Sequence, residues 1–575
     1  MAFRRCSVLS AVFIGIQLFT VFSMSTANAA YVRHGSHGQE SHRSDAIPVE
    51  ASAAMSDYVH ALLLDMKGDY WGAIDILRKV MAQRPTDAAV RYSMSRSWYR
   101  LAVLDSARVH GEAAVRIDPS NRHYLRHLAG IAHDMRDYNR SAELYGLFSQ
   151  AVPGRTDIMY MQGLEFLSAN QPEQALEVFK KAMRIDPYNE AALSHILFLE
   201  TGLRRYPEAI ETAKRLIKPG GGDRKLRITL AELYARNGQD TLAVQTLHEL
   251  IAADRSSVSS WIALFDYYIK AGRNHDFQRE LAGFLDTASS SPESLHDLGR
   301  LYISRSTRDS LYVGPAVDLL EEMIGRRPHD SELFMLKGLY GLMHQRQQDG
   351  LASLNRAVRL DPGNVSAWEY LISASFDQGE KRQAFDLLAK ARRRLPRQYL
   401  RWRTIEGNLL LYSGSPARAS VILEAVARSK TKDQEILIQA NTSLAMAYEL
   451  LGRKRRCREV YEMVIELDPH NTLAMNNLAY LLAEDGIMLQ QALRLASNAV
   501  LLEPENGVYL DTLGWVHYKL GNYELARQSL EKALAAGVDE GEIYQHMGEV
   551  YKKLGDEAKA TEMFGKAKST GNKKR

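Results

Sequence analysis

Proline recurs along this chain at a fixed spacing that few folds can accommodate. Most steps between neighbouring members of the series are 34 residues, and one is 35. Nine of the sixteen prolines belong to it: Pro85, Pro119, Pro153, Pro187, Pro328, Pro362, Pro396, Pro469 and Pro504. A period of this length indicates a stack of repeated supersecondary units and not a single globular core.

Small residues mark the places where the helices of each unit are expected to cross. Twelve residues before each of these prolines stands Ala73, Ala107, Ser141, Ala175, Ala316, Gly350, Ala384, Cys457 or Ala492. Each period holds two stretches with apolar residues three and four apart, which is typical of amphipathic helices. A glycine ends the first helix, as at Gly68 and Gly555, and the proline ends the second. We therefore expect fifteen two-helix units from about Ala54 to about Lys568, each burying its apolar stripe against its neighbours.

Two of these units carry the clearest family pattern. The last one, IYQHMGEVYKKLGDEAKATEMFGKA, has Gly548, Tyr551, Gly555, Ala560, Phe564 and Ala567, and the fourth has Gly163, Ala175, Phe179, Ala182 and Pro187. In these slots the chain resembles the tetratricopeptide repeat (TPR) family, over about 515 residues. The resemblance implies an all-α fold, a right-handed superhelical solenoid of about fifteen helix-turn-helix repeats.

The first thirty residues differ from the repeats. Arg4 and Arg5 precede an apolar run from Val8 to Phe22, and a small-residue pattern ends at Ala29. This order predicts a secretory signal peptide over residues 1–29, followed by a flexible polar linker over residues 30–53 and, after the repeats, a basic tail over residues 569–575. We expect export to the bacterial periplasm, with association with the outer membrane left open, and no transmembrane segment once the signal is removed.

The period is interrupted in the middle of the chain. Phe265 and Phe277 stand in small-residue slots of the seventh repeat, and about five extra residues lie within SRSTRDSLYVGP in the eighth. One interpretation is a hinge between an N-terminal arm (54–286, repeats 1–7) and a C-terminal arm (287–568, repeats 8–15). The other is loop drift, which solenoids tolerate; a second insertion near Arg428–Glu435 is interpreted as drift.

Motifs that carry catalysis are missing from the sequence. It has no Gly-rich phosphate loop, His-Glu-x-x-His pair, Cys-x-x-Cys or Gly-x-Ser-x-Gly elbow. Two groups of three histidines could hold a metal, and each has a plainer explanation. A disordered linker explains His34, His37 and His42, and surface and groove positions explain His123, His127 and His133. The prediction is a non-enzymatic protein with no catalytic residue, no metal and no cofactor.

In the TPR family the first helix of each repeat lines a concave groove, and its second, fifth, ninth and twelfth positions tend to face it. Carried over, the N-terminal groove residues are Tyr58, Leu62, Tyr92, Arg96, Tyr99, Arg126, His133, Tyr160, Leu164 and Leu167. This aromatic groove with interspersed positive charge suits an extended peptide or a helix of a partner protein. The alternative is that half of these residues pack only against the neighbouring repeat. The family's carboxylate-gripping set is not predicted, because Tyr58 and Leu62 replace its Lys and Asn.

A second groove is expected near the C-terminus. There the sequence resembles a block found in many long bacterial cell-envelope TPR proteins, and the groove-facing residues would be Asn476, Tyr480, Asp511, Trp515 and Tyr518. Asn476 and Asp511 occupy equivalent slots in adjacent repeats, so we expect them to lie side by side and to hydrogen-bond a ligand backbone.

Two basic runs, Lys390–Arg403 and Arg453–Arg458, stand out from a chain whose net charge is only +4. The candidate anion-binding residues are Arg392, Arg393, Arg394, Arg397, Arg455 and Arg456. They would suit anionic polysaccharide or lipid headgroups, whereas the export signal argues against nucleic acid. The alternative is a solvated face whose counter-charges lie elsewhere.

The sequence thus predicts a scaffold or adaptor of the bacterial periplasm that binds partner proteins or peptides in its groove to assemble or regulate an envelope machine. The alternative is a polysaccharide- or lipid-contacting component of surface-polysaccharide export that uses the basic runs.

Overall fold

The structure is a computed structural model that describes residues 49–217, 223–286 and 291–573. The predicted signal peptide and most of the predicted linker lie outside the described residues, as do the last two residues of the predicted basic tail. By its internal contacts the chain divides into two compact units, and the division falls between Ser294 and Leu295. We call the described residues up to Ser294 the N-terminal unit and those from Leu295 the C-terminal unit.

The N-terminal unit is built of helices only. They are α2 (Val49–Lys67), α3 (Tyr70–Gln83), α4 (Ala88–Arg100), α5 (Leu104–Ile117), α6 (Arg122–Asp134), α7 (Tyr138–Ala151), α8 (Thr156–Ser168), α9 (Pro172–Ile185), α10 (Glu190–Gly202), α11 (Tyr206–Leu216), α12 (Arg224–Arg236), α13 (Asp240–Ala253), α14 (Val258–Lys270) and α15 (Asn274–Leu285).

The C-terminal unit begins in the first turn of α16 and adds two short 3₁₀ helices. Its elements are α16 (Pro292–Ser306), η1 (Ser310–Tyr312), α17 (Val313–Arg326), α18 (Ser331–Met343), α19 (Gln347–Leu360), α20 (Val365–Asp377), α21 (Lys381–Arg394), η2 (Pro396–Gln398), α22 (Tyr399–Tyr412), α23 (Pro416–Ala427), α24 (Gln434–Leu450), α25 (Lys454–Leu467), α26 (Thr472–Asp485), α27 (Leu489–Leu502), α28 (Gly507–Lys519), α29 (Tyr523–Ala535), α30 (Gly541–Lys553) and α31 (Glu557–Lys573).

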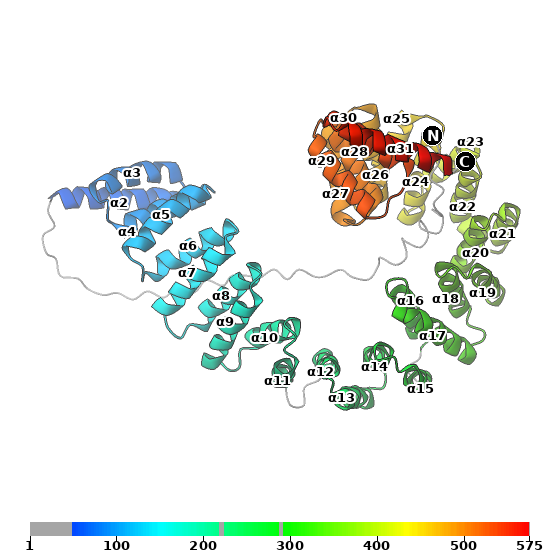
Figure 1. Cartoon of the computed structure of the whole chain (residues 1–575), viewed down its shortest axis with the longest axis horizontal. Coiled ribbons are helices and arrows are strands. Elements are labelled where there is room, and N and C mark those ends of the chain that lie inside the picture. The colour runs from blue at the N-terminus through cyan, green and yellow to red at the C-terminus, as the bar shows by residue number, and fades with distance from the viewer. Residues whose placement is uncertain (1–48, 218–222, 287–290, 574–575) are drawn as a thin grey trace. The chain divides into compact units, whose positions relative to one another are not determined.

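Consecutive helices pair, and the pairs stack in chain order within each unit (Figure 1). The first helices of successive pairs also contact each other, for example α4 with α6 and α26 with α28, and within the described residues successive second helices contact each other less. The first helices therefore form the inner layer of each unit. The described residues form fifteen such pairs, which confirms the predicted all-α solenoid.

The small-residue slots explain why the two helices of a pair lie so close. A Cβ atom added at Gly163 of α8 would lie 2.6 Å from the ring of Phe179 on α9. At Gly548 of α30 the corresponding distance to the Phe564 ring is 2.5 Å. Both are too short for real carbon atoms, so a larger residue would force the helices apart.

The turn after the first helix requires a left-handed backbone. Glycine supplies it in many repeats, such as Gly272 with a φ of +68°. In six places a residue with a side chain takes the same conformation: Ala102, Arg136, Asn170, Arg204, Gln345 and Met488. Residues other than glycine are strained there, so their side chains are retained at a cost in stability.

The seventh repeat accommodates large residues where small ones were expected. Phe265 of α14 and Phe277 of α15 are both fully buried, with ring centres 5.5 Å apart and planes 89° to each other. This edge-to-face contact fills the crossing that a small residue fills elsewhere. The predicted hinge stays a prediction, because residues 287–290 that follow lie outside the described part of the chain.

The two insertions predicted from the sequence fall between helices. The first contains η1, between α16 and α17, and the second is the six-residue connection from α23 to the long helix α24. Within the described residues, no helix combines the length and the apolar content that a bilayer crossing needs.

Candidate functional site

The inner layer of the N-terminal unit carries the predicted tyrosines, and each contacts a neighbouring repeat through a hydrogen bond or a ring contact. The Tyr58 hydroxyl lies 3.0 Å from Ser93 Oγ, and Tyr99 donates to Asp134 at 2.5 Å. Because the Tyr99 hydroxyl donates to a carboxylate, its pKa is raised. These bonds fix the rings along the row of first helices.

Arg96 and Tyr92 belong to the same row. Arg96 pairs with Asp65 of the preceding repeat at 3.0 Å, and its guanidinium lies 5.9 Å from the Tyr92 ring centre. Tyr92 in turn contacts Tyr124 of the next repeat, with ring centres 4.8 Å apart. Arg126 is exposed on α6. The structure thus aligns these residues on one layer, while their use in binding stays a prediction.

Tyr160 and Leu164 extend the row onto α8. Tyr160 is hydrogen-bonded to His195 Nε2 of α10 at 2.9 Å, and His195 is stacked on Phe179 with ring centres 5.2 Å apart. Leu164 packs against the buried cluster of this repeat. Tyr160 and Leu164 therefore pack against neighbouring residues of the repeats as well as lying on the inner layer.

Near the C-terminus the predicted residues form a closed network on α26, α28 and α30, which we call the C-terminal cluster. Its members are Tyr480, Glu484, Asp511, Trp515, Tyr518, Glu542 and His546. Three hydrogen bonds hold it together: His546 Nδ1 to Asp511 at 2.9 Å, Trp515 Nε1 to Glu484 at 2.6 Å, and Tyr480 to Glu542 at 2.6 Å. The last one spans a whole repeat.

Ring stacking closes the C-terminal cluster further. Trp515 lies parallel to Tyr518 with ring centres 4.8 Å apart, and near-parallel to His546 at 4.1 Å. Lys519 Nζ lies 4.8 Å from the Trp515 ring centre. Trp515 is only 9% exposed and belongs to the buried core of the C-terminal unit. The polar and aromatic groups of this cluster are therefore engaged with each other.

Asn476 lies one repeat before Asp511, and each is 3% exposed. The Asn476 amide donates to Asn477 Oδ1 at 3.3 Å, while its own carbonyl oxygen has no hydrogen-bond partner in the described chain. Asp511 accepts from His546. The predicted joint contact of Asn476 and Asp511 with a ligand backbone stays a prediction.

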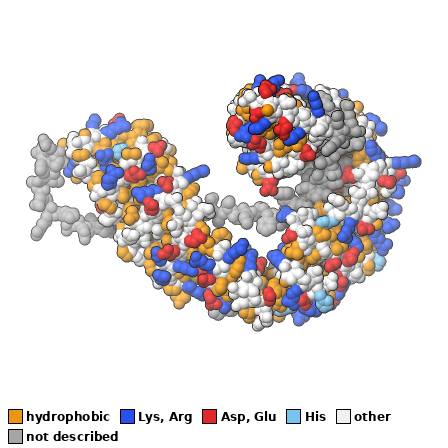
Figure 2. All heavy atoms as spheres, viewed as in Figure 1, with side chains coloured by type: hydrophobic (Ala, Val, Ile, Leu, Met, Phe, Trp, Pro, Cys, Tyr) orange, Lys and Arg blue, Asp and Glu red, His pale blue; other side chains and the backbone are white. Residues whose placement is uncertain are grey.

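Many residues of the basic runs have acidic neighbours. Arg392 pairs with Glu406 at 3.3 Å, Arg455 with Glu459 at 2.9 Å, and Arg456 lies 3.6 Å from Glu424. Three others, Arg393, Arg394 and Arg397, are exposed and form no ion pair with the described residues. On the face shown in Figure 2, basic and acidic side chains are interspersed over both units.

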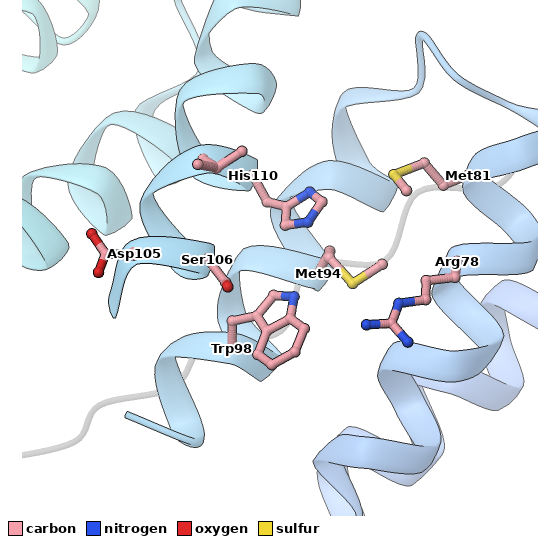
Figure 3. A pocket seen from close by; sticks show the side chains of 8 residues that line it. Arg78, Met81, Met94, Trp98, Asp105, Ser106 and His110 are labelled. Carbon is pink, nitrogen blue, oxygen red and sulfur yellow. The ribbon is translucent and has the colours of Figure 1, made fainter. Parts of the chain in front are cut away.

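One depression lies between α3, α4 and α5 and has a volume of about 370 Å³. Figure 3 shows Met81, Met94, Trp98 and His110 pointing toward it, with Arg78 at its edge. The Arg78 guanidinium lies 5.9 Å from the Trp98 ring centre. Burial lowers the pKa of His110, whose Nδ1 has no partner among the described residues. This depression is lined by the first helix α4 and by the second helices α3 and α5.

A larger depression, which we call the α10–α12 pocket, lies on the inner layer and has a volume of about 550 Å³. Its lining is Ser194, Leu197, Phe198, Thr201, Gly202, Arg204, Tyr206, Thr229 and Arg236. Phe198 occupies the same first-helix slot as Leu164 and Trp515, yet it is 71% exposed. Phe198 was not predicted, although it stands one period of 34 residues after Leu164, in the same groove position.

Histidines also join the repeats, and of these only His133 was predicted as a groove residue. Six described histidines hydrogen-bond a side chain of an adjacent repeat: His127 with Ser95, His133 with Glu165, His195 with Tyr160, His296 with Asp330, His344 with Ser306 and His546 with Asp511. Their recurrence on first helices was visible in the sequence, but their partners were not. Among the described residues, no group of three potential ligand residues is arranged to hold a metal ion.

Family models described as tetratricopeptide repeat match the chain over five segments: residues 156–189, 344–399, 438–471, 509–536 and 541–569. With the fifteen stacked pairs of the described residues, these matches support a protein of the tetratricopeptide repeat family. Proteins of this fold are in general protein-interaction scaffolds.

Two bacterial relatives and one of the similar solved structures illustrate what the chain resembles. A TPR repeat-containing protein of Pseudomonas aeruginosa is 25% identical over 211 residues, which cover 36% of this chain and 35% of the relative. The chain thus matches about a third of that protein's length. The TPR repeat-containing protein YpiA of Bacillus subtilis is 23% identical over 297 residues, covering 46% and 70%. The structure of Naa15/Naa10 bound to HypK-THB is 14% identical, covers 89% of this chain and 95% of that chain, and has a TM-score of 0.43.

Proposed function

We propose that the chain is a non-enzymatic scaffold that binds segments of partner proteins along the inner layer of its repeats. The observation that carries the proposal is the row of tyrosines in the N-terminal unit. Tyr58, Tyr99 and Tyr160 are each held by a hydrogen bond to a side chain of the next repeat. Rings that are already fixed lose little conformational freedom on binding, so more of the contact energy remains for the partner.

The predicted export signal supports a location in the bacterial periplasm, where the scaffold would assemble or regulate an envelope machine. Both relatives are bacterial proteins named for their repeats. Affinity capture of the full chain from an envelope fraction, compared with capture from cytosol, addresses the location. Partners found only in the cytosolic fraction would argue against it.

The groove assignment is tested by substitution. Changing Tyr92 and Tyr99 to Ser removes two half-buried rings from the inner layer. We expect the variant to keep its helical circular dichroism and to capture its partner several-fold more weakly. The control is Val109→Ser, which changes an exposed apolar residue on the second helix α5. Equal capture by all three proteins would contradict a role for this row.

A second candidate function is contact with anionic polysaccharide or lipid headgroups. It is favoured by Arg393, Arg394 and Arg397, which are exposed and form no ion pair with the described residues. Binding of this kind should weaken steeply between low and physiological salt, whereas groove binding of apolar side chains should not. Changing Arg394 and Arg397 to Ala should abolish vesicle binding without affecting partner capture. Vesicle binding unchanged by these substitutions would rule the candidate out.

A further inference from the structure

The arginine side chains of the α10–α12 pocket have no partners among the described residues, unlike Arg96 of the same inner layer, which pairs with Asp65. Arg204 and Arg236 are exposed, and neither guanidinium group forms an ion pair or a hydrogen bond with the described residues. Lys225, one turn before Thr229, is also exposed and unpaired. Glu232 is the acidic residue between Thr229 and Arg236 on the same helix, and it forms no ion pair with Arg236.

The serine and threonine hydroxyls of the pocket have hydrogen-bond partners inside their own helices. The hydroxyls of Ser194, Thr201 and Thr229 each donate to the carbonyl oxygen four residues earlier. Each hydroxyl oxygen can still accept a hydrogen bond, but its hydrogen is already donated. The arginines are the charged groups of the pocket that can still gain a strong interaction, and a guanidinium best matches a carboxylate.

The apolar part of the pocket is built as an anchor site. Leu197 is buried and Tyr206 is half-buried, and beside them the Phe198 ring is 71% exposed. A large aromatic ring at the edge of a concave surface is a common energetic centre of protein interfaces. An apolar side chain of a ligand would cover it and remove both surfaces from water.

Arg204 has a left-handed backbone conformation, which is strained for a residue with a side chain. Its φ is 58°, in the left-handed turn where most repeats have glycine. Glycine would relieve the strain at this turn, so the arginine side chain is kept there against the local preference.

We propose that the α10–α12 pocket binds a segment of a partner protein that carries a bulky apolar side chain flanked by carboxylates. The apolar side chain covers Phe198 and Leu197, and the carboxylates bind Arg204 and Arg236. The proposal deepens the scaffold function and rests on it. It assigns the pocket to an acidic, apolar partner segment and not to a second copy of this chain.

The test uses the full chain and two fluorescent 15-residue peptides. In one, Leu and Phe alternate with Glu, and in the other Lys replaces every Glu. Fluorescence anisotropy should show binding of the acidic peptide at least ten-fold tighter than binding of the basic one. Equal affinity for the two peptides, or no binding of the acidic one, would overturn the proposal.

Variants locate the binding. Phe198→Ala and Arg236→Glu should each weaken the acidic peptide at least five-fold. Arg204→Glu should also weaken the acidic peptide at least five-fold. Arg136→Glu is the matched control, since Arg136 has the same left-handed backbone and is also exposed. It should have no effect, because Arg136 does not line the pocket. Full affinity in the Phe198 and Arg236 variants would place the peptide elsewhere and refute the pocket.

Analytical ultracentrifugation of the full chain tests whether a second copy of the chain occupies the pocket. Self-association of the full chain that is lost in Phe198→Ala would show a second copy in the pocket and overturn the partner assignment. If the acidic peptide fails to bind while the Tyr92 and Tyr99 variant still loses partner capture, this inference falls and the scaffold function stands. If the tyrosine variant captures normally, the failure lies with the proposed function.

Discussion

The C-terminal cluster and the α10–α12 pocket both contain aromatic and charged side chains. In the cluster these side chains contact each other, whereas most of those in the pocket are exposed to solvent. In the cluster, Trp515 donates to Glu484 and is stacked on Tyr518 and His546. In the pocket, Phe198 is exposed and Arg236 has no acidic partner. Aromatic and charged residues in a groove slot therefore do not by themselves define a binding site. A ligand binds most readily to groups that are exposed and have no partner within the protein.

The largest expected difference between the two regions is in stability. Trp515→Ala should lower the free energy of unfolding by about 3–4 kcal/mol, because it empties a buried site and removes two ring stacks. Urea denaturation followed by circular dichroism measures it. Phe198→Ala is the matched control and should change stability by less than about 0.5 kcal/mol. Similar losses for the two variants would erase the distinction.

Lowering the pH should reduce the stability of the N-terminal unit because His127 becomes protonated. Burial lowers its pKa to about 4, and its Nε2 lies 3.1 Å from Ser95 Oγ, which itself donates to the Ala107 carbonyl at 2.6 Å. The folded state thus binds this proton less readily than the unfolded state, whose histidine pKa is about 6.5. Stability should be complete above pH 6.5 and fall by up to about 3 kcal/mol as the pH drops toward 4.

Urea denaturation at several pH values between 7 and 4 measures this dependence. His127→Gln keeps a donor for Ser95 and has no titrating group. The variant should therefore show a shallower loss of stability than the natural chain. Identical slopes for the two proteins would mean that His127 titrates normally.

A smaller effect is expected from the buried pair of the C-terminal cluster. Asp511→Leu leaves His546 Nδ1 without its acceptor in a buried site. The cost should be about 2 kcal/mol. Asp511→Asn retains an acceptor oxygen and should recover most of the loss. If the two variants unfold alike, the hydrogen bond to His546 contributes little.

The smallest effect should have the opposite sign. Arg204→Gly relieves a left-handed residue and should raise the free energy of unfolding by about 1 kcal/mol. Arg136→Gly should give a similar gain, because its φ of 61° is nearly the same. Of the two, Arg204→Gly alone should also weaken the acidic peptide. Weaker binding in both variants would remove the special role of Arg204.

The repeat architecture was predictable because the period is set by short-range rules. Close helix crossings need small residues, as at Gly163 opposite Phe179, and left-handed turns favour glycine, as at Gly272. These requirements recur at fixed positions in the sequence. The crossing of Phe265 and Phe277 was not predictable, since two large rings fit there only by packing edge to face.

The candidate sites were predictable only in part. The slot rule placed Tyr92, Tyr99 and Trp515 on the inner layer, but it did not reveal that His546 is stacked on Trp515. A partner 31 residues away along the sequence depends on side-chain rotamers and on the stagger of adjacent repeats. Arg204 and Arg236 stand at a turn and at a helix end, outside the groove slots, so the rule could not find them.

Hydrogen–deuterium exchange of the full chain, with and without the acidic peptide, tests the central claim most directly. The account predicts slower amide exchange in α10 and α12 on peptide binding and unchanged exchange in α28 and α30. Protection of α28 and α30 with none in α10 and α12 would contradict it, because the closed C-terminal cluster would then be the site that binds.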